Sequence, residues 1–316
     1  MRDYLNHQNT EPLANDYLGG KLYAFKPIKG PVLTRHTIMK ILERITDDTS
    51  TFTLKVSLDL GLSTSSVEVR GNIVVFPQDE QISLNKLSSY VNDIDDDDVL
   101  AVICNDLRKI AFSVGKNYYK LKAVGPHTAP TLEINGIHMH RIVDITPWED
   151  SLLKVRCARV RRGMRVLDVC TGLGYTAIAS LLRGAREVIT IEVDEHVLEI
   201  ASYNPWSWRL ANDKIRVVLG DATEVINNIE NSSFDRIIHD PPTIAIAGEL
   251  YSKEFYEELF RVLRRGGVLF HYTGKPGHLR GINITKGVAN RLRQVGFRVE
   301  VVKSACGVVA FKPRSN

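Results

Sequence analysis

The feature that most constrains the fold is the stretch of residues 165–175, where an apolar run is followed at once by a glycine turn and a helical pattern. The turn carries Gly172 and Gly174, because a side chain there would hold the backbone away from a ligand. A strand, a glycine turn and a helix open a doubly wound nucleotide-binding sheet, which binds ligands at the carboxyl ends of its strands. Asp168 occupies that end of the first strand. Taken alone, the pattern also fits an ordinary tight turn.

From residue 165 onward, β-type runs alternate with helical patterns. The predicted strands are 165–169, 187–193, 215–219, 234–239, 268–272, 297–303 and 308–311, and the predicted helices are 175–183, 195–211, 222–229, 252–263 and 285–295. Such alternation predicts a parallel sheet with helices on both faces. Only residues 304–307 separate the last two strands, which must therefore pair as an antiparallel hairpin. This α/β pattern, a Rossmann-like domain of seven strands, resembles the class I S-adenosylmethionine (SAM)-dependent methyltransferases.

Short β-type runs dominate residues 52–141, and Asn135-Gly136 between two of them is a strong hairpin signal. The acidic run 93–98 predicts a loop, because adjacent like charges repel. Residues 146–149 (Thr-Pro-Trp-Glu) predict a helix start with a capping box. We therefore predict a small β-rich N-terminal domain over residues 1–143, with RNA binding as its candidate role, and the Rossmann-like domain over residues 144–316.

The composition is that of an ordinary globular protein, with 44% hydrophobic and 25% charged residues in a chain of 316. No apolar stretch is long enough to span a bilayer and the first residues lack a signal-peptide core, so we expect a cytoplasmic protein without a membrane partner. The cysteines form no C-x-x-C pair, which predicts neither a zinc site nor a disulfide framework. Each is expected to be a small buried hydrophobe; they are Cys104, Cys157, Cys170 and Cys306.

Positive charge is concentrated in the second part of the chain. Residues 1–140 hold 15 Lys and Arg against 17 Asp and Glu, whereas the remainder holds 26 against 20. The excess forms two clusters, which are Lys154, Arg156, Arg159, Arg161, Arg162 and Arg165, and then Arg280, Lys286, Arg291, Arg293 and Arg298. Such clusters attract phosphate backbones, although a solvated basic helix face has the same pattern.

Acidic residues lie at the ends of the first three predicted strands. Glu192 closes the second strand, at the distance from the glycine turn expected of an acid that binds ribose hydroxyls. Asp221 follows the third strand, where the methyltransferase resemblance implies an acid that accepts a hydrogen bond from the adenine amino group. Singly, such an acid is more often a helix cap. Together they predict a SAM-type cofactor held by Asp168, Thr171, Gly172, Gly174, Glu192, Val193, Asp221 and Ala222.

The fourth strand ends in Asp240-Pro241-Pro242-Thr243, which resembles the Asp/Asn-Pro-Pro-aromatic motif of methyltransferases acting on planar exocyclic or amide nitrogens. Such an amine is a poor nucleophile because its lone pair is delocalised. A carboxylate and a backbone carbonyl can accept both N–H bonds and hold the lone pair toward the methyl donor. Paired prolines remove two N–H donors and stiffen the loop. These four residues are the predicted catalytic set, which acts by positioning and electrostatics.

The motif departs from its usual form at Thr243, where an aromatic residue normally stacks on the target base. Trp206, Tyr251 or Tyr272 could supply that surface, although core packing is the commoner role of an aromatic side chain. Lys275, in a Gly-Lys-Pro-Gly loop after the fifth strand, could contact a phosphate or simply water. The identity of the target base therefore stays open.

Two chemistries are not expected. Carbon-5 methylation of pyrimidines requires a cysteine nucleophile in the active loop, and the sequence has none near Asp240. His239, His271 and His278 lack metal-ligand spacing, so no metal is predicted. The first two of these histidines either line the pocket or form ordinary buried hydrogen bonds.

Further segments resemble a family of archaeal class I methyltransferases. They are residues 240–252, Phe255-Tyr256, Gly266-Gly267, 274–277, Asn-Pro-Trp-Ser at 204–207 and Thr-Pro-Trp-Glu-Asp at 146–150. The resemblance, over residues 140–316, implies N4 methylation of cytidine in small-subunit ribosomal RNA, giving N4,N4-dimethylcytidine. Asp240 and the Pro241 carbonyl would then orient the amine, while the basic clusters and the N-terminal domain would hold the RNA.

Three alternatives remain. Archaeal branched-chain polyamine synthases resemble the chain and carry an Asp-Pro-Pro loop, but they transfer an aminopropyl group from decarboxylated SAM. Their polyamine substrates favour an acidic pocket, whereas the basic catalytic part of this chain favours an anionic polymer. Enzymes that methylate protein side-chain amides usually have Asn in place of Asp240. A non-catalytic RNA-binding protein is the third alternative, against which the intact acids at the strand ends argue.

Overall fold

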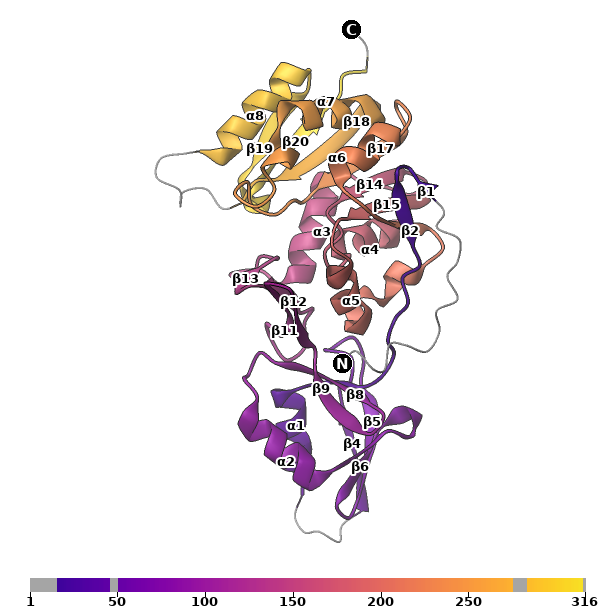
Figure 1. Ribbon diagram of the computed structural model, residues 1–316, viewed down its shortest axis with the longest axis vertical. Helices are drawn as coiled ribbons and strands as arrows, with labels where there is room; N and C mark the ends of the chain where they lie inside the picture. The colour runs from indigo at the N-terminus through magenta and orange to yellow at the C-terminus, as the bar shows by residue number, and fades with distance from the viewer. Residues whose placement is uncertain (1–15, 46–50, 275–282, 315–316) are drawn as a thin grey trace.

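The computed structural model describes residues 16–45, 51–274 and 283–314. It has a larger lobe that contains the C-terminal residues, a smaller N-terminal lobe, and a four-stranded sheet between them (Figure 1). The larger lobe is built on a nine-stranded sheet of order β1-β2-β16-β15-β14-β17-β18-β20-β19. Its C-terminal strands are β14 (Arg165–Val169), β15 (Glu187–Glu192), β16 (Ile215–Leu219), β17 (Phe234–His239), β18 (Leu263–Tyr272), β19 (Arg298–Val302) and β20 (Gly307–Phe311).

The seven predicted strands are all present. Strands β14 to β18 run parallel to one another, whereas β20 pairs antiparallel with both β18 and β19, which confirms the predicted hairpin. After β14 the chain moves first to β15 and β16 on one side and then to β17 and β18 on the other. This reversal next to β14 is the topological switch point at which such sheets bind ligands.

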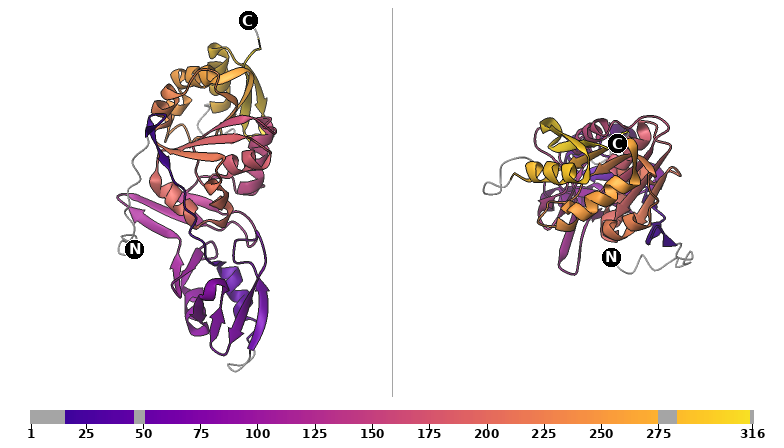
Figure 2. Two further views of the ribbon diagram at one scale, coloured as in Figure 1. Left: turned by 90° about the vertical axis from the view of Figure 1, so that its right-hand side faces the viewer. Right: turned by 90° about the horizontal axis from the view of Figure 1, so that it is seen from above.

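Helices cover both faces of this sheet (Figure 2). Side chains alternate along a strand, so Val166 of β14 packs into one core cluster and Leu167 into the other. Helices α3, α4 and α5 contribute to the first cluster, and α6, α7 and α8 to the second. Their bounds are α3 (Pro147–Cys157), α4 (Tyr175–Leu182), α5 (Glu195–Tyr203), α6 (Ala222–Val225), α7 (Lys253–Val262) and α8 (Ile284–Val295).

Two predicted helix features can be compared directly. The capping box at the start of α3 is confirmed, since the Thr146 hydroxyl accepts from the Glu149 backbone N–H and the Glu149 carboxylate accepts from the Thr146 backbone N–H. The single helix expected over 195–211 is wrong. Pro205 ends α5 because proline cannot donate the helical hydrogen bond, and the 3-10 helix η3 (Pro205–Ala211) follows with Asn204 as its cap.

The nine-stranded sheet includes two strands from the start of the chain. Strand β2 (Gly20–Tyr23) pairs antiparallel with β16, and β1 (Asp16–Tyr17) pairs with β2. They cover what would otherwise be an open edge at β16. The sequence analysis did not foresee this pairing. The domain division at residue 143 stays a prediction. Strands β1 and β2 precede that residue but belong to the sheet of the larger lobe.

The N-terminal lobe is β-rich, as predicted. It contains a three-stranded and a four-stranded sheet, while β10 to β13 form the sheet between the lobes (Figure 1). The Asn135-Gly136 hairpin joins β12 and β13, as expected. Helix α2 was not predicted. The bounds are β3 (Val32–Thr34), α1 (Arg35–Leu42), β4 (Thr51–Val56), β5 (Ser65–Arg70), β6 (Ile73–Val75), β7 (Gln81–Ser83), α2 (Leu84–Asp93), β8 (Val99–Ile103), β9 (Asp106–Lys109), β10 (Ala111–Val114), β11 (Asn117–Lys122), β12 (Thr131–Ile134) and β13 (Ile137–His138).

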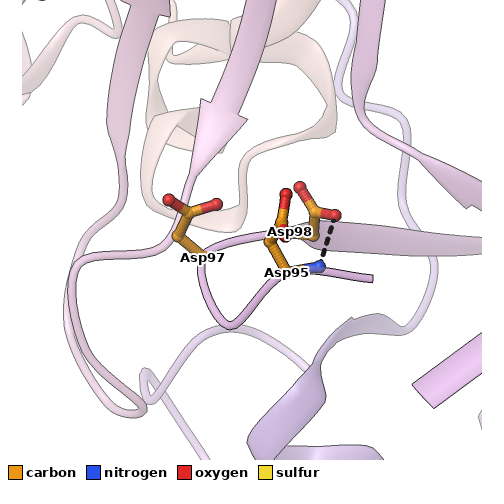
Figure 3. Close-up of side chains that lie close together, drawn as sticks. All are labelled: Asp95, Asp97 and Asp98. Atoms are coloured by element: carbon orange, nitrogen blue, oxygen red, sulfur yellow. Dashed lines mark hydrogen bonds between the residues drawn. The ribbon is translucent and has the colours of Figure 1, made fainter. Parts of the chain in front are cut away.

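The acidic run forms the predicted loop, and its carboxylates are paired. Asp95, Asp97 and Asp98 gather there (Figure 3). Lys120 Nζ lies 2.5 Å from Asp97 and 2.7 Å from Asp98, and Lys109 Nζ lies 2.7 Å from Asp98. These lysines compensate the like charges, so the loop can pack against the intermediate sheet.

Contacts from the N-terminal part reach loops at the carboxyl ends of the parallel strands. The Tyr119 hydroxyl donates to Asp194 at 2.6 Å, and the Trp206 indole donates to the Leu60 carbonyl at 3.2 Å. The N-terminal lobe therefore faces the ligand-binding edge of the sheet. Within the described ranges, no helix is long and apolar enough to cross a bilayer. Cys104 is exposed in a turn between β8 and β9, so the expectation that every cysteine is buried is wrong.

Candidate active site

The candidate site lies at the carboxyl edge, where β14, β15 and β17 end side by side. Val169 is in register with Ile191 on one side and His239 on the other, so the next residues of the three strands are neighbours. The Asp240 backbone N–H donates to the Val169 carbonyl at 3.3 Å. The structure thus brings the glycine turn, Glu192 and the Asp-Pro-Pro loop together at the switch point.

Glu192 is held by the backbone around it. Its carboxylate accepts hydrogen bonds from the N–H groups of Gly172 (2.8 Å), Val193 (3.0 Å) and Asp194 (3.2 Å). Burial raises the pKa of Glu192 to about 7, and these backbone hydrogen bonds oppose the rise. The carboxylate is therefore fixed in position at the end of β15.

The surroundings of Glu192 fit the adenosine part of a SAM-type cofactor. Gly172 has a φ of +53°, and a Cβ added there would meet nothing within 4 Å, so space is open beside the turn. The Val193 side chain is 69% exposed and offers an apolar surface next to the carboxylate. Gly172, Glu192 and Val193 would hold the nucleoside.

Asp221 and Asp168 have structural partners as well. Asp221 Oδ1 accepts from the Thr223 backbone and hydroxyl at 2.7 Å, so this residue caps α6. Ala222, at the start of α6, is buried. Asp168 is fully buried, accepts from the Thr190 hydroxyl at 2.8 Å, and has its pKa raised to about 7 by burial. Thr171 meets the same Thr190 hydroxyl at 2.7 Å. These residues fix the turn.

Asp240 is paired with a buried lysine that sequence reasoning did not place here. Lys154 Nζ lies 2.9 Å and 2.7 Å from the two carboxylate oxygens of Asp240, and 2.8 Å from Asp150. Asp150 also binds Arg141 at 2.8 Å. The result is a chain of alternating charges, Arg141, Asp150, Lys154 and Asp240, that leads from the lobe junction into the site.

The Lys154–Asp240 pair is largely removed from water, so burial shifts the pKa of both groups. The Lys154 side chain is only 2% exposed and that of Asp240 17%. Burial by itself lowers the pKa of Lys154, but the Asp240 and Asp150 carboxylates outweigh it and raise that pKa. Burial raises the pKa of Asp240, and Lys154 limits the rise. The Tyr272 ring, centred 4.3 Å from Lys154 Nζ, adds a cation–π contact.

The position of Lys154 shows that the first basic cluster does not act as one phosphate-attracting group. The sequence analysis grouped it with residues that attract phosphate, yet it is buried and neutralised by two carboxylates. The available signal was the spacing of Asp150 and Lys154, which places them one turn apart on a helix. Arg165 of the same cluster is paired with Glu187.

The Asp-Pro-Pro loop is anchored from behind. The Tyr251 hydroxyl donates to the Pro242 carbonyl at 2.8 Å, and the His239 ring donates to the Leu250 carbonyl at 2.9 Å. Tyr251 is only 3% exposed, so it supports the loop and offers no stacking surface. Pro241 is buried and Thr243 is exposed.

The remaining candidates differ in their positions. Tyr272 and Trp206 are half-buried, and Trp206 packs on Trp148 with ring centroids 5.6 Å apart. Lys275 and His278 lie outside the described residues. His271 is fully buried and its ring meets the Tyr256 hydroxyl at 2.9 Å, an ordinary buried hydrogen bond.

A cysteine does lie beside Asp240, contrary to the expectation from sequence distance. Cys170 follows β14 directly, between the ends of β15 and β17. Burial raises the pKa of its thiol well above the ordinary value, and the Glu192 and Asp240 carboxylates add to this. A thiol in that environment is a poor nucleophile.

Comparison with known proteins gives the family. The chain is 54% identical over 199 residues to the Methanocaldococcus jannaschii protein "Uncharacterized protein MJ1233", in an alignment that covers 62% of this chain and 68% of that protein. The chain belongs to the MJ1233 family. A model of the spermine/spermidine synthase domain also matches residues 172–306 of this MJ1233-family chain.

More distant similarity extends to enzymes that use different donors. The polyamine aminopropyltransferase of M. jannaschii is 28% identical over 120 residues, which cover 37% of this chain and 40% of the enzyme. Putrescine N-methyltransferase 1 of Nicotiana tabacum is 26% identical over 142 residues, or 44% and 38% of the two chains. The MJ1233-family chain thus spans less than half of either enzyme.

The solved spermidine synthase of Thermotoga maritima shares the fold, with a TM-score of 0.50 and 19% identity over 65% of this chain and 72% of that one. These comparisons show a spermidine synthase-like domain with a class I methyltransferase-like fold. The relatives are transferases, and their family uses SAM or decarboxylated SAM.

The two glycines of the turn should respond differently to alanine. Gly172→Ala adds a Cβ in open space at positive φ, costing about 1–2 kcal/mol of stability but blocking the cofactor. Gly174→Ala places a Cβ 2.5 Å from the buried Leu210 side chain, which adds overpacking of about 1–3 kcal/mol. Urea unfolding and calorimetric titration with SAM measure both; unchanged SAM affinity in Gly172→Ala would contradict the placement.

Cofactor binding should depend on pH through Glu192. Because the folded-state pKa is about 7, the carboxyl is mostly protonated at pH 6, and ribose hydroxyls prefer the ionised form. Affinity for 5′-methylthioadenosine, which carries the ribose but no titrating amine, should rise by about tenfold from pH 6 to pH 8. Calorimetry checks this, with Glu192→Gln as the control that should remove the dependence. In the free protein the raised pKa has the opposite effect, since its stability contribution is lost as pH rises through 7.

Breaking the buried ion pair should destabilise the fold. Lys154→Met leaves Asp240 buried without its cation, which costs about 3–5 kcal/mol at pH 7. The loss should be smaller at pH 5 than at pH 8, because burial raises the pKa of Asp240 and removal of Lys154 raises it further, so the carboxyl takes up a proton more readily at the lower pH. Denaturant unfolding measures both. The double variant Lys154→Met/Asp240→Leu should regain most of the stability, and a single variant as stable as the wild type would refute the pairing.

Proposed function

We propose that the protein is a SAM-dependent N-methyltransferase that acts on an exocyclic amine of a nucleobase in RNA, with cytidine N4 in small-subunit ribosomal RNA as the favoured target. One observation carries the choice of amine. Both carboxylate oxygens of Asp240 bind the buried Lys154 ammonium, directly beside the edge that carries Gly172 and Glu192.

This pairing favours a neutral amine over a polyamine. An alkylamine has a pKa near 10 and arrives as a cation, which Lys154 would repel in a desolvated site. Burial raises the pKa of Asp240 and Lys154 limits the rise, so the carboxylate stays an acceptor beside an ammonium. An aromatic amine is neutral and needs only hydrogen-bond acceptors, which an ion-paired carboxylate still provides through its remaining lone pairs.

The residues of the loop would do the positioning. Asp240 accepts one N–H of the amine and the Pro241 carbonyl accepts the other, so that the lone pair points to the donor. The prolines and the Tyr251–Pro242 hydrogen bond keep these acceptors fixed. The cofactor, when bound, supplies an electrophilic methyl group, and the raised pKa of Asp240 suits it to receive the proton that the amine gives up.

The charge of the chain and the arrangement of its lobes support RNA as the substrate. The catalytic part of the chain has 26 Lys and Arg against 20 Asp and Glu, an excess that attracts a polyanion. The N-terminal lobe faces the carboxyl edge through Tyr119 and Trp206, so it can contact RNA whose target base enters the site.

Aminopropyl transfer from decarboxylated SAM is the second candidate. It is favoured by the match to the spermine/spermidine synthase domain over residues 172–306. Both reactions need the same adenosine site and an activated nitrogen, and the donor distinguishes them.

The test combines the donor with the product. We expect SAM to raise the melting temperature more than decarboxylated SAM, and a strain lacking the protein to lose one methylated nucleoside from ribosomal RNA by mass spectrometry. Asp240→Asn should abolish turnover while SAM affinity stays within about threefold. Preference for decarboxylated SAM with unchanged RNA nucleosides would establish the second candidate, and joint loss of SAM binding and turnover in Asp240→Asn would make the loop structural.

A further inference from the structure

We propose that an arginine surface at the amino edge of the sheet binds the phosphate backbone of a large folded RNA, on the opposite side from the reacting nucleotide. The surface comprises Arg159, Arg161, Arg162, Arg186 and Arg236. This inference rests on the proposed function and specifies its substrate as a folded RNA rather than a nucleotide or a short strand.

These arginines gather where the parallel strands begin. Arg161 and Arg162 precede β14, and Arg186 precedes β15. The Arg186 backbone N–H donates to the Met164 carbonyl at 2.9 Å, so the segments before the two strands lie side by side. The Arg236 side chain, from the start of β17, donates to the Arg159 carbonyl at 3.1 Å. Segments distant in sequence thus bring their charges to one face.

Their charge is not compensated by neighbouring acids. Among the residues that the structure describes, no carboxylate lies within 4.0 Å of these five guanidinium groups. Asp235 is close in sequence, but its carboxylate is engaged by Arg264 at 2.9 Å and by the Arg165 N–H at 2.8 Å. Burial lowers the pKa of Arg236; the Asp235 carboxylate opposes this shift, and Arg161 and Arg159 add to it. Clustered like charges of this kind are stabilised by a polyanion.

Four of the five side chains are exposed, and one is preoriented. Arg159, Arg161, Arg162 and Arg186 are exposed, whereas Arg236 is partly buried. The Arg159 guanidinium lies over the Phe311 ring at 4.7 Å, and Arg298 lies 4.4 Å from the centroid of the same ring. A planar guanidinium held on an aromatic ring keeps its N–H edge free, and that edge matches phosphate oxygens in a bidentate manner.

The distance between the two edges sets the size of the ligand. Strand β14 has five residues, which span about 17 Å at the usual rise. Asp240 lies beyond one end of the strands and the arginine surface beyond the other. A single nucleotide cannot reach both edges, whereas a folded RNA can present its target base at one edge and its backbone at the other.

The experiment removes charge from this surface alone. The variant R159Q/R161Q/R162Q is compared with K214Q/K253Q/K303Q, which removes three exposed charges outside both basic clusters. Binding to deproteinised small-subunit ribosomal RNA is measured as a function of salt. Because each phosphate contact contributes about 0.7–0.9 to the slope of log K against log salt, the first variant should lose about 2–3 from the slope and bind about tenfold more weakly or worse.

Two further readouts localise the effect. The melting temperature and SAM affinity of the arginine variant should match the wild type, and methylation of a short oligonucleotide around the target should be unchanged while that of the full RNA falls. Wild-type RNA affinity and slope in the arginine variant, or an equal loss in the control variant, would overturn the inference. If the arginine variant binds normally but Asp240→Asn is inactive on RNA, only the arginine surface is refuted; if no RNA is methylated by the wild type, the proposed function fails.

Discussion

The contact between Lys154 and Asp240 is the interaction on which the site depends. It joins helix α3, which precedes the sheet, to the end of β17, 86 residues later in the chain. Burying two charges is expensive unless they are paired with opposite charges, and here Asp150 and Arg141 extend the pairing. The pair fixes the position of the carboxylate and sets its basicity at once. An acceptor that is held beside an ammonium suits an amine that arrives without a positive charge.

Much of the catalytic lobe was predictable because its signals are local. The central parallel strands β14 and β15 are mostly buried and therefore appear as short apolar runs, and every α-helix of this lobe except α4 begins at a capping side chain. The hairpin of β19 and β20 followed from a connection too short for a crossover. The parallel arrangement then places Glu192 and Asp240 at the same edge of the sheet, because both residues lie at the carboxyl ends of strands.

The features that were missed depend on contacts between distant segments. Strand β2 is only four residues long and has meaning as a strand only through its pairing with β16. Lys154 has the same local context as the exposed arginines that follow it, and its burial depends on Asp240. Cys170 is far from Asp240 in sequence but adjacent across the sheet. Tyr251 has the composition of a stacking residue, yet its hydroxyl supports the loop from behind.

The match to the spermine/spermidine synthase domain divides the residues around Asp240 into two groups. The match begins at residue 172 and so includes Glu192 and Asp240. Lys154, Asp150 and Arg141 all precede it, and they supply the charges that surround Asp240. The environment of Asp240 therefore depends on helix α3 and the segment before it as well as on the matched domain. A change of charge in α3 would alter that environment without altering the sheet.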